Sequence, residues 1–258
     1  MSFLAEDVVA RFYLFLWPMV RISALLLTAP PFSNNVFNLR LRVVLALALT
    51  WMIYPLHAWP KIDPLSAVGL AELLNQVAIG ATMGLILQVV VAALVLAGHA
   101  ISATMGLTMA NMIDPSVGNV PILSQFLIVL STLIFVGTGG HAMLLGLVLE
   151  SFRWLPIGQS ILTQDAYGLV IRWSSMIFLG GLLMALPVMV SLLFINVGLG
   201  VVTRAAPSLN IFAVGFPAMV IAGFIVLMLS MDSIGGRIEW LWVQGFSTLR
   251  AFMGAPNG

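Results

Sequence analysis

The sequence contains no cysteine among its 258 residues and very few charged side chains. Without cysteine, the chain has no disulfide framework, no thiol nucleophile and no cysteine-based metal site. Charged residues make up 7% of the chain and hydrophobic residues 61%, whereas about a quarter of the residues in soluble domains are charged. The composition therefore predicts an integral membrane protein.

Basic and acidic residues nearly balance, with 10 Lys and Arg against 9 Asp and Glu and a formal net charge of +1. A nucleic-acid-binding protein would carry a basic patch, so no nucleic-acid partner is expected. The sequence also lacks the glycine-rich phosphate loops of nucleotide-binding proteins and the G-x-S-x-G turn that presents a serine nucleophile. We predict that the protein is not an enzyme and uses no cofactor.

The three histidines, His57, His99 and His141, stand far apart along the chain. None has a second histidine or an acidic partner at the spacing of a metal site on one helix, so no metal site is predicted. His99 and His141 are expected to be buried polar residues that bond to a neighbouring helix, in preference to a proton relay. A membrane enzyme is the weaker alternative, since the acidic residues are scattered apart from Glu6 and Asp7.

Charge-poor stretches separated by turn-forming residues predict about six hydrophobic helices and an all-α membrane protein. Arg21 falls near the middle of the first of them and is expected to face protein or water, because a charge at the bilayer centre is costly. The expected elements are 12–29, 43–59, 68–97, 121–149, 168–203 and 209–231, with a shorter apolar piece at 238–253.

The longest uncharged run extends over 41 residues, from Leu73 to Ile113, and ends at Asp114-Pro115. A helix of that length would measure about 60 Å, twice the roughly 30 Å hydrocarbon core of a bilayer. We therefore expect this segment to bend, break or dip within the membrane region.

Small residues recur at four-residue spacing along this run, in the pairs Gly80 and Gly84, and Gly98 and Ser102. Such spacing places small side chains on one face of a helix, where another backbone can approach closely. Packing within the chain is the simpler interpretation, and contact with other subunits is the alternative. The sequence does not separate the two.

Met105, Met109 and Met112 follow at three- and four-residue spacing. Such a stripe is usually part of a helical core, because methionine fills irregular gaps. The interleaved polar residues Asn111 and Asp114 favour irregular backbone that is buried in protein or lines a water-filled path. On the residues alone, a core stripe and a pore constriction or plug are equally compatible with this pattern.

A secondary transporter is the other class of function that the residues allow. Such proteins bind a small solute at broken helices near the membrane midplane. Pro187, Asn196, Gly198 and Gly200 could form such a break. A transporter would work as a single chain or homo-oligomer, whereas a subunit of a larger gate would need other proteins.

Four separated segments of this chain together resemble one protein family. They read FLWPMVRISALLLTAPPFS from residue 15, MGLTMANMIDPSVGNVPILSQF from residue 105, GGHAMLLGLVLESFRWLPIG from residue 139 and INVGLGVVTRAAPSLNIFAVGFPAMVIAGF from residue 195. In order and spacing they closely resemble the FliR family, the export-gate subunits of flagellar and virulence type III secretion systems. The resemblance covers nearly the whole chain, and its closeness favours the flagellar system.

The resemblance implies a FliP-like helical region over residues 1–167 and a FliQ-like helical hairpin over residues 168–258. One copy of such a protein joins FliP and FliQ subunits in a helical hetero-oligomeric export gate in the bacterial inner membrane, at the flagellar basal body. FlhB near the entrance and unfolded export substrates are further implied partners. The implied cytoplasmic turn of the hairpin comprises Arg204, Ala205, Ala206 and Pro207.

The family also has a plug in the central pore, in a loop that corresponds to about residues 105–119 of this chain. The resemblance implies that this plug keeps the polypeptide-conducting channel closed until a substrate is exported. The implied plug residues are Met105, Gly106, Leu107, Thr108, Met109, Ala110, Asn111, Met112, Ile113, Asp114 and Pro115.

Overall fold

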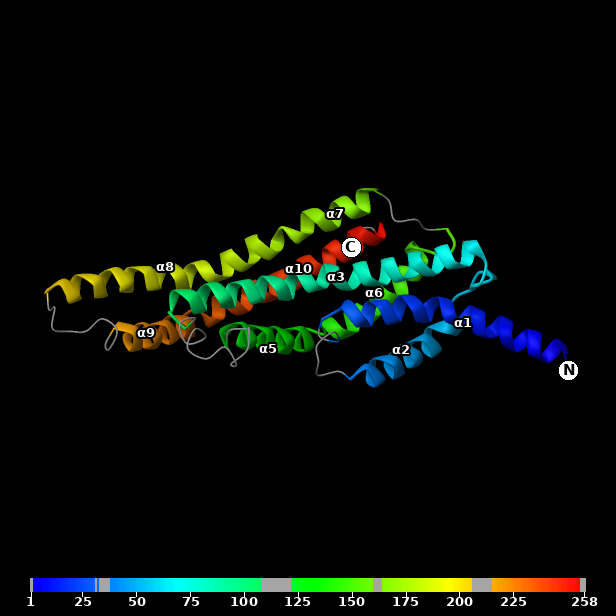
Figure 1. Cartoon of the computed structure of the whole chain (residues 1–258), viewed down its shortest axis with the longest axis horizontal. Coiled ribbons are helices and arrows are strands. Elements are labelled where there is room, and N and C mark those ends of the chain that lie inside the picture. Colours follow the sequence, from blue (N-terminus) through cyan, green and yellow to red (C-terminus); the bar gives the residue numbers. More distant parts are fainter. Residues whose placement is uncertain are drawn as a thin grey trace. The chain divides into compact units, whose positions relative to one another are not determined.

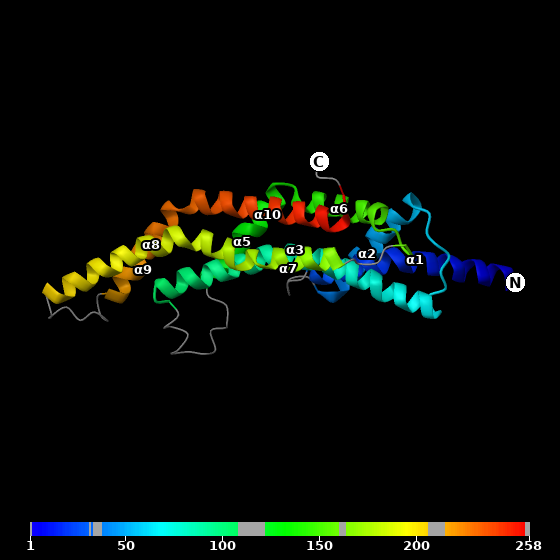
Figure 2. The same ribbon diagram turned by 90° about the horizontal axis from the view of Figure 1, so that it is seen from above.

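The computed structural model describes residues 2–30, 32, 38–107, 122–159, 164–205 and 215–255. Within these ranges all regular structure is helical and no strand is present. Figures 1 and 2 show the helices in two views at right angles. The prediction of an all-α protein is confirmed.

The first of two compact units comprises Met1–Val89, Gly139–Ser174 and Gln244–Gly258. In this unit α1 and α2 pack side by side (Figure 1). The indole N–H of Trp173 donates to the Ile86 carbonyl at 2.7 Å and attaches α7 to α3. The unit contains α1 (Ser2–Thr28), α2 (Leu39–Ile53), η1 (Tyr54–Leu56), the first part of α3 (Ala67–Thr104), α6 (Gly140–Trp154), α7 (Gln164–Ser174) and the end of α10 (Met231–Met253).

The second unit comprises Val90–Thr138 and Ser175–Val243. In this unit α8 and α9 pack against each other as a hairpin (Figures 1 and 2). The indole N–H of Trp242 in α10 donates to the Ser131 hydroxyl of α5 at 2.9 Å. The unit contains the rest of α3, α5 (Ile122–Gly137), α8 (Met176–Ala205), α9 (Phe216–Leu229) and the first part of α10.

Several helices have the length and composition of membrane spans. Four candidate spans lie in the described part of the chain, at Arg11–Thr28, Leu39–Leu56, Ala67–Thr104 and Gln164–Ala205, and the total reaches six if the bent pairs α5 with α6 and α9 with α10 each count as one. This pattern confirms the prediction of a membrane protein.

The expectation that the long uncharged run bends, breaks or dips is confirmed in its described part, because the helix ends within the run, at the left-handed Gly106. α3 is one helix of 38 residues, from Ala67 to Thr104. At about 1.5 Å per residue it measures roughly 57 Å, so it cannot lie wholly within a hydrocarbon core of about 30 Å along the membrane normal. Leucine, valine, isoleucine and alanine fill most of its length, and nothing within it breaks the helical hydrogen bonds.

Two of the predicted elements are each divided into two helices. The element expected at 121–149 is divided into α5 and α6 around Gly139, which has φ +76°. Only glycine adopts this left-handed backbone without strain, so the position ends one helix and allows the next to start in another direction. The element expected at 168–203 is divided at Ser175, between α7 and α8.

The two units are each made of segments that are distant in sequence. The predicted division between residues 167 and 168 separates a part that resembles FliP from a part that resembles FliQ. The two compact units are defined by contacts within the chain, so they do not test that resemblance. That division therefore stays a prediction.

Candidate functional site

The C-terminal end of α3 carries the described part of the predicted plug. Gly106 has a left-handed backbone, with φ +78°. Its amide donates to the Ala103 carbonyl at 3.1 Å, and the Leu107 amide donates to the Ser102 carbonyl at 3.0 Å. This pair of bonds is a Schellman motif, in which glycine ends a helix and the last carbonyl groups are satisfied. Gly106, the second residue of the predicted plug, is thus the residue that stops α3.

The side chain of Met105 fills a notch in α9. Met105 is 0% exposed, and a Cβ built on Gly223 would lie 2.5 Å from its Cε, 2.6 Å from its Cγ and 2.8 Å from its Sδ. A Cβ built on Gly106 would lie 3.4 Å from two ring carbons of Phe216, the first residue of α9. We call these four residues the α3–α9 contact. It holds the start of the predicted plug against α9 within the second unit.

Most of the predicted plug lies outside the described residues, and so does half of the predicted turn. Arg204 and Ala205 are the last two residues of α8, where a positive side chain interacts favourably with the helix dipole. The residues outside the described ranges are Thr108, Met109, Ala110, Asn111, Met112, Ile113, Asp114, Pro115, Ala206 and Pro207.

Gly80 and Gly84 of the predicted small-residue face pack against α1 within the chain. A Cβ built on Gly80 would collide with the carbonyl oxygen of Arg21. A Cβ built on Gly84 would collide with the Thr28 hydroxyl and would lie 2.7 Å from the backbone nitrogen of Ala29. These are the close backbone approaches that small residues permit between membrane helices.

Gly98 and Ser102 lie in the second unit. A Cβ built on Gly98 would lie 2.5 Å from the backbone nitrogen of Ser124, so α5 approaches α3 closely at this glycine. The Ser124 hydroxyl donates to the Val95 carbonyl at 3.0 Å across this approach. Ser102 is buried, and its hydroxyl oxygen has no hydrogen-bond partner in the described part of the chain.

The histidines do not form a chemical centre. His99 Nδ1 lies 2.8 Å from the Val95 carbonyl oxygen and 3.2 Å from the Ser124 hydroxyl of α5, which confirms that a neighbouring helix satisfies it. The same expectation is wrong for His141, which is exposed. Over the described ranges no group of three or more His, Cys, Asp or Glu residues could hold a metal ion.

Arg21 is a buried charge at the junction of three helices of the first unit, with only 1% of its surface exposed. Its Nε donates to Gln76 Oε1 of α3 at 2.7 Å, its Nη1 to the Ser151 carbonyl of α6 at 2.9 Å, and its Nη2 to the Leu155 carbonyl at 2.7 Å. The guanidinium carbon also lies 4.4 Å from the centre of the Phe152 ring. The expectation that Arg21 faces protein or water is confirmed, and we call these groups the arginine network.

Glu72 extends the arginine network to the chain that follows α6. Its Oε1 accepts hydrogen bonds from the Gln76 side-chain amide and, at 3.0 Å, from the Gly158 backbone amide. Gln76 therefore connects an acidic residue to Arg21. A buried charge is tolerated when opposite charge and hydrogen bonds compensate it, and here both are supplied within the chain.

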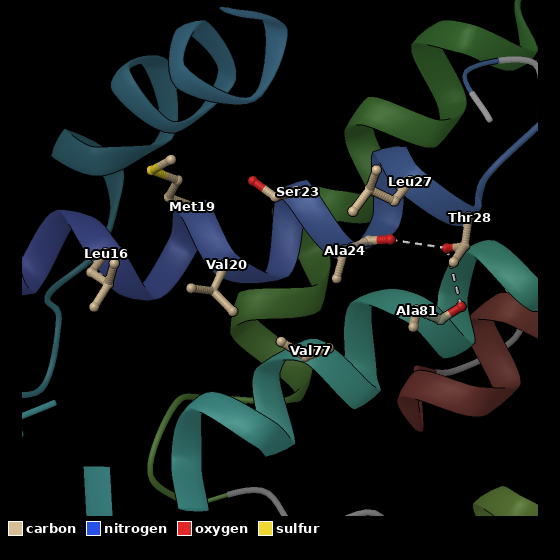
Figure 3. Close-up of a pocket in the computed structure, with 9 residues that line it drawn as sticks. All are labelled: Leu16, Met19, Val20, Ser23, Ala24, Leu27, Thr28, Val77 and Ala81. Carbon is tan, nitrogen blue, oxygen red and sulfur yellow. Dashed lines mark hydrogen bonds between the residues drawn. The ribbon is translucent and has the colours of Figure 1, made fainter. Parts of the chain in front are cut away.

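A cavity of about 370 Å³ lies between α1 and α3 in the first unit (Figure 3). Of the residues drawn there, none is charged, and the Thr28 hydroxyl is within hydrogen-bond distance of the Ala24 carbonyl at 3.0 Å and the Ala81 carbonyl at 3.3 Å. The cavity therefore presents no group suited to acid–base or metal chemistry. Its lining residues are Leu16, Met19, Val20, Ser23, Ala24, Leu27, Thr28, Val77 and Ala81.

The helices and their contacts define the class of this molecule: an all-α membrane protein whose distinctive features are interhelical packing and a glycine-terminated helix. Residues 12–244 match the sequence profile of the family described as bacterial export proteins, family 1. The chain belongs to this family.

Characterised relatives align with the chain over nearly its whole length. It is 35% identical to the flagellar biosynthetic protein FliR of Pectobacterium carotovorum subsp. carotovorum over 250 residues, which cover 96% of each chain. It is 34% identical to FliR of Escherichia coli K12, over 92% of this chain and 91% of the relative. It is 28% identical to FliR of Bacillus subtilis 168, over 95% of this chain and 96% of the relative.

Family membership decides several of the predictions. The resemblance to the FliR family is confirmed, and the chain is an inner-membrane component of the flagellar export apparatus and not an enzyme. The transporter alternative loses its structural basis, because Pro187, Asn196, Gly198 and Gly200 all lie inside α8, which runs unbroken from Met176 to Ala205.

Proposed function

We propose that this chain forms part of the polypeptide-conducting channel of the flagellar export apparatus and supplies a plug that closes the channel until a substrate is exported. The observation that carries the proposal is the end of α3. A long apolar helix stops at Gly106, in a Schellman motif, at the start of the segment that resembles the plug of the FliR family. Buried Met105 anchors the base of that segment.

The proposed plug comprises residues 105 to 115. Its apolar members Leu107, Met109, Met112 and Ile113 are bulky, and a hydrophobic constriction closes a pore to water and ions by contact and dewetting. Methionine suits this role because it is large, apolar and deformable. Asn111 and Asp114 are candidates for hydrogen bonds that hold the plug in place.

The proposed partners are FliP and FliQ subunits in one hetero-oligomeric complex, with FlhB near the entrance and unfolded polypeptides as cargo. In support, α8 exposes large apolar side chains along its length, including Phe178, Leu193 and Phe194, which are 70%, 61% and 73% exposed. Apolar surface of this extent needs lipid or other subunits to cover it.

The division into a FliP-like part, residues 1–167, and a FliQ-like hairpin, residues 168–258, belongs to the same proposal. The packing of α8 against α9 supports it, because two adjacent antiparallel helices are what a hairpin subunit contributes. In this arrangement the turn from Arg204 to Pro207 faces the cytoplasm.

Replacing Met109 and Met112 together by alanine tests the plug. The variant should raise the small-ion conductance of the reconstituted complex without abolishing its assembly, because the replacement removes apolar volume from the constriction. Met52→Ala is the matched control, since Met52 on α2 is 52% exposed and lies outside the proposed plug. If the double variant assembles and its conductance equals that of the wild type, the plug proposal is wrong.

A further inference from the structure

We infer that α2 faces the lipid bilayer directly, so that acyl chains cover its exposed side and anionic phospholipid headgroups bind at Arg40 and Arg42. The inference goes beyond the proposed function and does not depend on the plug. It begins from burial. Of the four candidate spans in the described part of the chain, Leu39–Leu56 is the least buried, with 22% of its residues inside the protein.

The length of α2 fits a bilayer. Together with η1, which follows it directly, it forms a candidate span of 18 residues. At about 1.5 Å per residue this span extends roughly 27 Å, close to the hydrocarbon core of about 30 Å. α3, with 38 residues, and the candidate span Gln164–Ala205, with 42, are much longer than the core. The two ends of α2 are therefore expected at the two membrane surfaces.

The two sides of α2 carry residues of different size. Ala46 and Thr50 are buried and stand four residues apart, and α1 packs beside α2 (Figure 1). Helices in membranes pack closely where their residues are small, so this side suits a protein neighbour. The exposed side carries large apolar residues, with Trp51 as much as 78% exposed, and it suits acyl chains. These exposed residues include Leu41, Val43, Val44, Leu47, Trp51 and Met52.

α8 provides the contrast within the same chain. Its exposed residues include Gly198 and Gly200, and a Cβ built on either of them would meet nothing within 4 Å. Open small residues of this kind allow the backbone of another helix to approach closely. The sequence of α2 contains no glycine. A partner helix therefore fits the exposed side of α8, and lipid fits that of α2.

The side chains at the two ends of α2 suit the two membrane surfaces. Arg40, which is exposed, and Arg42 lie among its first four residues. Long basic side chains at a helix end reach the headgroup region, where they attract anionic lipids. Tyr54 and Trp59 lie at the other end, where the Trp59 indole N–H donates to the Tyr54 carbonyl at 2.8 Å. Tyrosine and tryptophan are enriched at membrane surfaces.

Photo-crosslinking in native membranes identifies what covers α2. Because the sequence has no cysteine, Val44→Cys provides a single point in this chain for attaching a benzophenone maleimide. Leu193→Cys on α8 is the matched control, since Val44 and Leu193 are both 61% exposed. Mass spectrometry of the illuminated chain should show phospholipid adducts at residue 44. At residue 193 the proposed function predicts adducts with another protein subunit.

The crosslinks separate this inference from the proposed function. Protein adducts as the main product at residue 44 would overturn the lipid-facing role of α2, and so would the absence of phospholipid adducts from a chain labelled there. Phospholipid adducts at both positions would leave the inference standing and would contradict the proposed subunit contacts of α8.

Thermal unfolding of the purified complex in detergent tests the headgroup site. Phosphatidylglycerol should raise the Tm by several degrees more than phosphatidylcholine does, because a ligand that binds the folded state stabilises it. Arg40→Gln combined with Arg42→Gln should abolish this difference between the two lipids. Arg40→Lys combined with Arg42→Lys keeps the charge and should preserve it.

The difference between the two lipids is the readout, so a general loss of stability in a variant does not imitate the expected result. A wild-type complex that responds equally to both lipids would overturn the headgroup site. The same conclusion would follow if the glutamine variant kept the full difference.

Discussion

The two ends of α3 are held in opposite ways. Near its N-terminal end, Gln76 accepts a hydrogen bond from buried Arg21 and Glu72 accepts one from the Gly158 amide, so polar groups fix the helix to α1 and to the chain that follows α6. Near its C-terminal end, Met105 is held by an apolar notch at Gly223. The hydrogen bonds of Arg21 form only in one geometry, and losing them leaves a buried charge unpaired. The Met105 side chain can move out of its notch without that consequence, because it is flexible and uncharged.

This difference indicates where the molecule can move. Breaking the arginine network leaves a buried guanidinium without its acceptors, which is a large cost. Separating Met105 from α9 costs mainly apolar contact. The polar end of α3 is therefore expected to be held more rigidly than the apolar end.

The largest effect should follow from Arg21→Met. The variant removes the donors to Gln76, Ser151 and Leu155 in a buried site, and we expect a loss of about 3–5 kcal/mol in the free energy of unfolding. Denaturation of the purified complex in detergent, followed by circular dichroism, measures this. Arg40→Gln is the control, because Arg40 is exposed, and it should change stability by less than about 0.5 kcal/mol. A stable Arg21→Met variant would show that the network is not a scaffold.

A smaller effect is expected from Gly84→Ala. The new methyl group would meet the Thr28 side chain and the backbone nitrogen of Ala29, neither of which can yield without a shift of α1, so we expect a loss of about 2–3 kcal/mol. Gly198→Ala is the matched control in open space on α8, and it should be neutral or stabilise by up to about 1 kcal/mol. Equal behaviour of the two variants in the same unfolding assay would contradict the close packing of α3 on α1.

The smallest effect on stability should follow from Gly223→Ala. The added methyl group meets only side-chain atoms of Met105, which can adopt another rotamer, so we expect a loss of about 1 kcal/mol. The same unfolding measurement, run beside Gly84→Ala, compares the packing of α3 on α1 with its packing on α9. A loss at Gly223 as large as at Gly84 would mean that the contact with α9 is as rigid as the contact with α1.

Much of the helical architecture could be predicted from the sequence, because charge-poor segments and turn residues mark membrane helices plainly. The break at Gly139 was missed although Gly137, Gly139 and Gly140 form a turn signal in the sequence, because the apolar stretches on both sides were taken as one element. The break in the long uncharged run was predictable from its length against the bilayer thickness, but its position at Gly106 was not, because the run contains several glycines at which a helix could end.

The candidate site was predictable only in part. The spacing of Gly80 and Gly84 indicated close packing, but the partner, α1, is 55 or more residues away in sequence and could not be identified from a periodic pattern. Likewise, the sequence indicated that Arg21 needs a polar partner, because a charge within the membrane is costly. It did not indicate that this partner is Gln76. The contact at Gly223 could not be predicted from the sequence, because its partner, Met105, lies far away along the chain.

The composition of the complex that copurifies with this chain in mild detergent tests most directly whether the protein works as one subunit of a hetero-oligomeric export gate. Native mass spectrometry of that complex should show this chain together with several copies of two other small membrane subunits, of the FliP and FliQ kinds. A homogeneous dimer of this chain alone would contradict the proposed function.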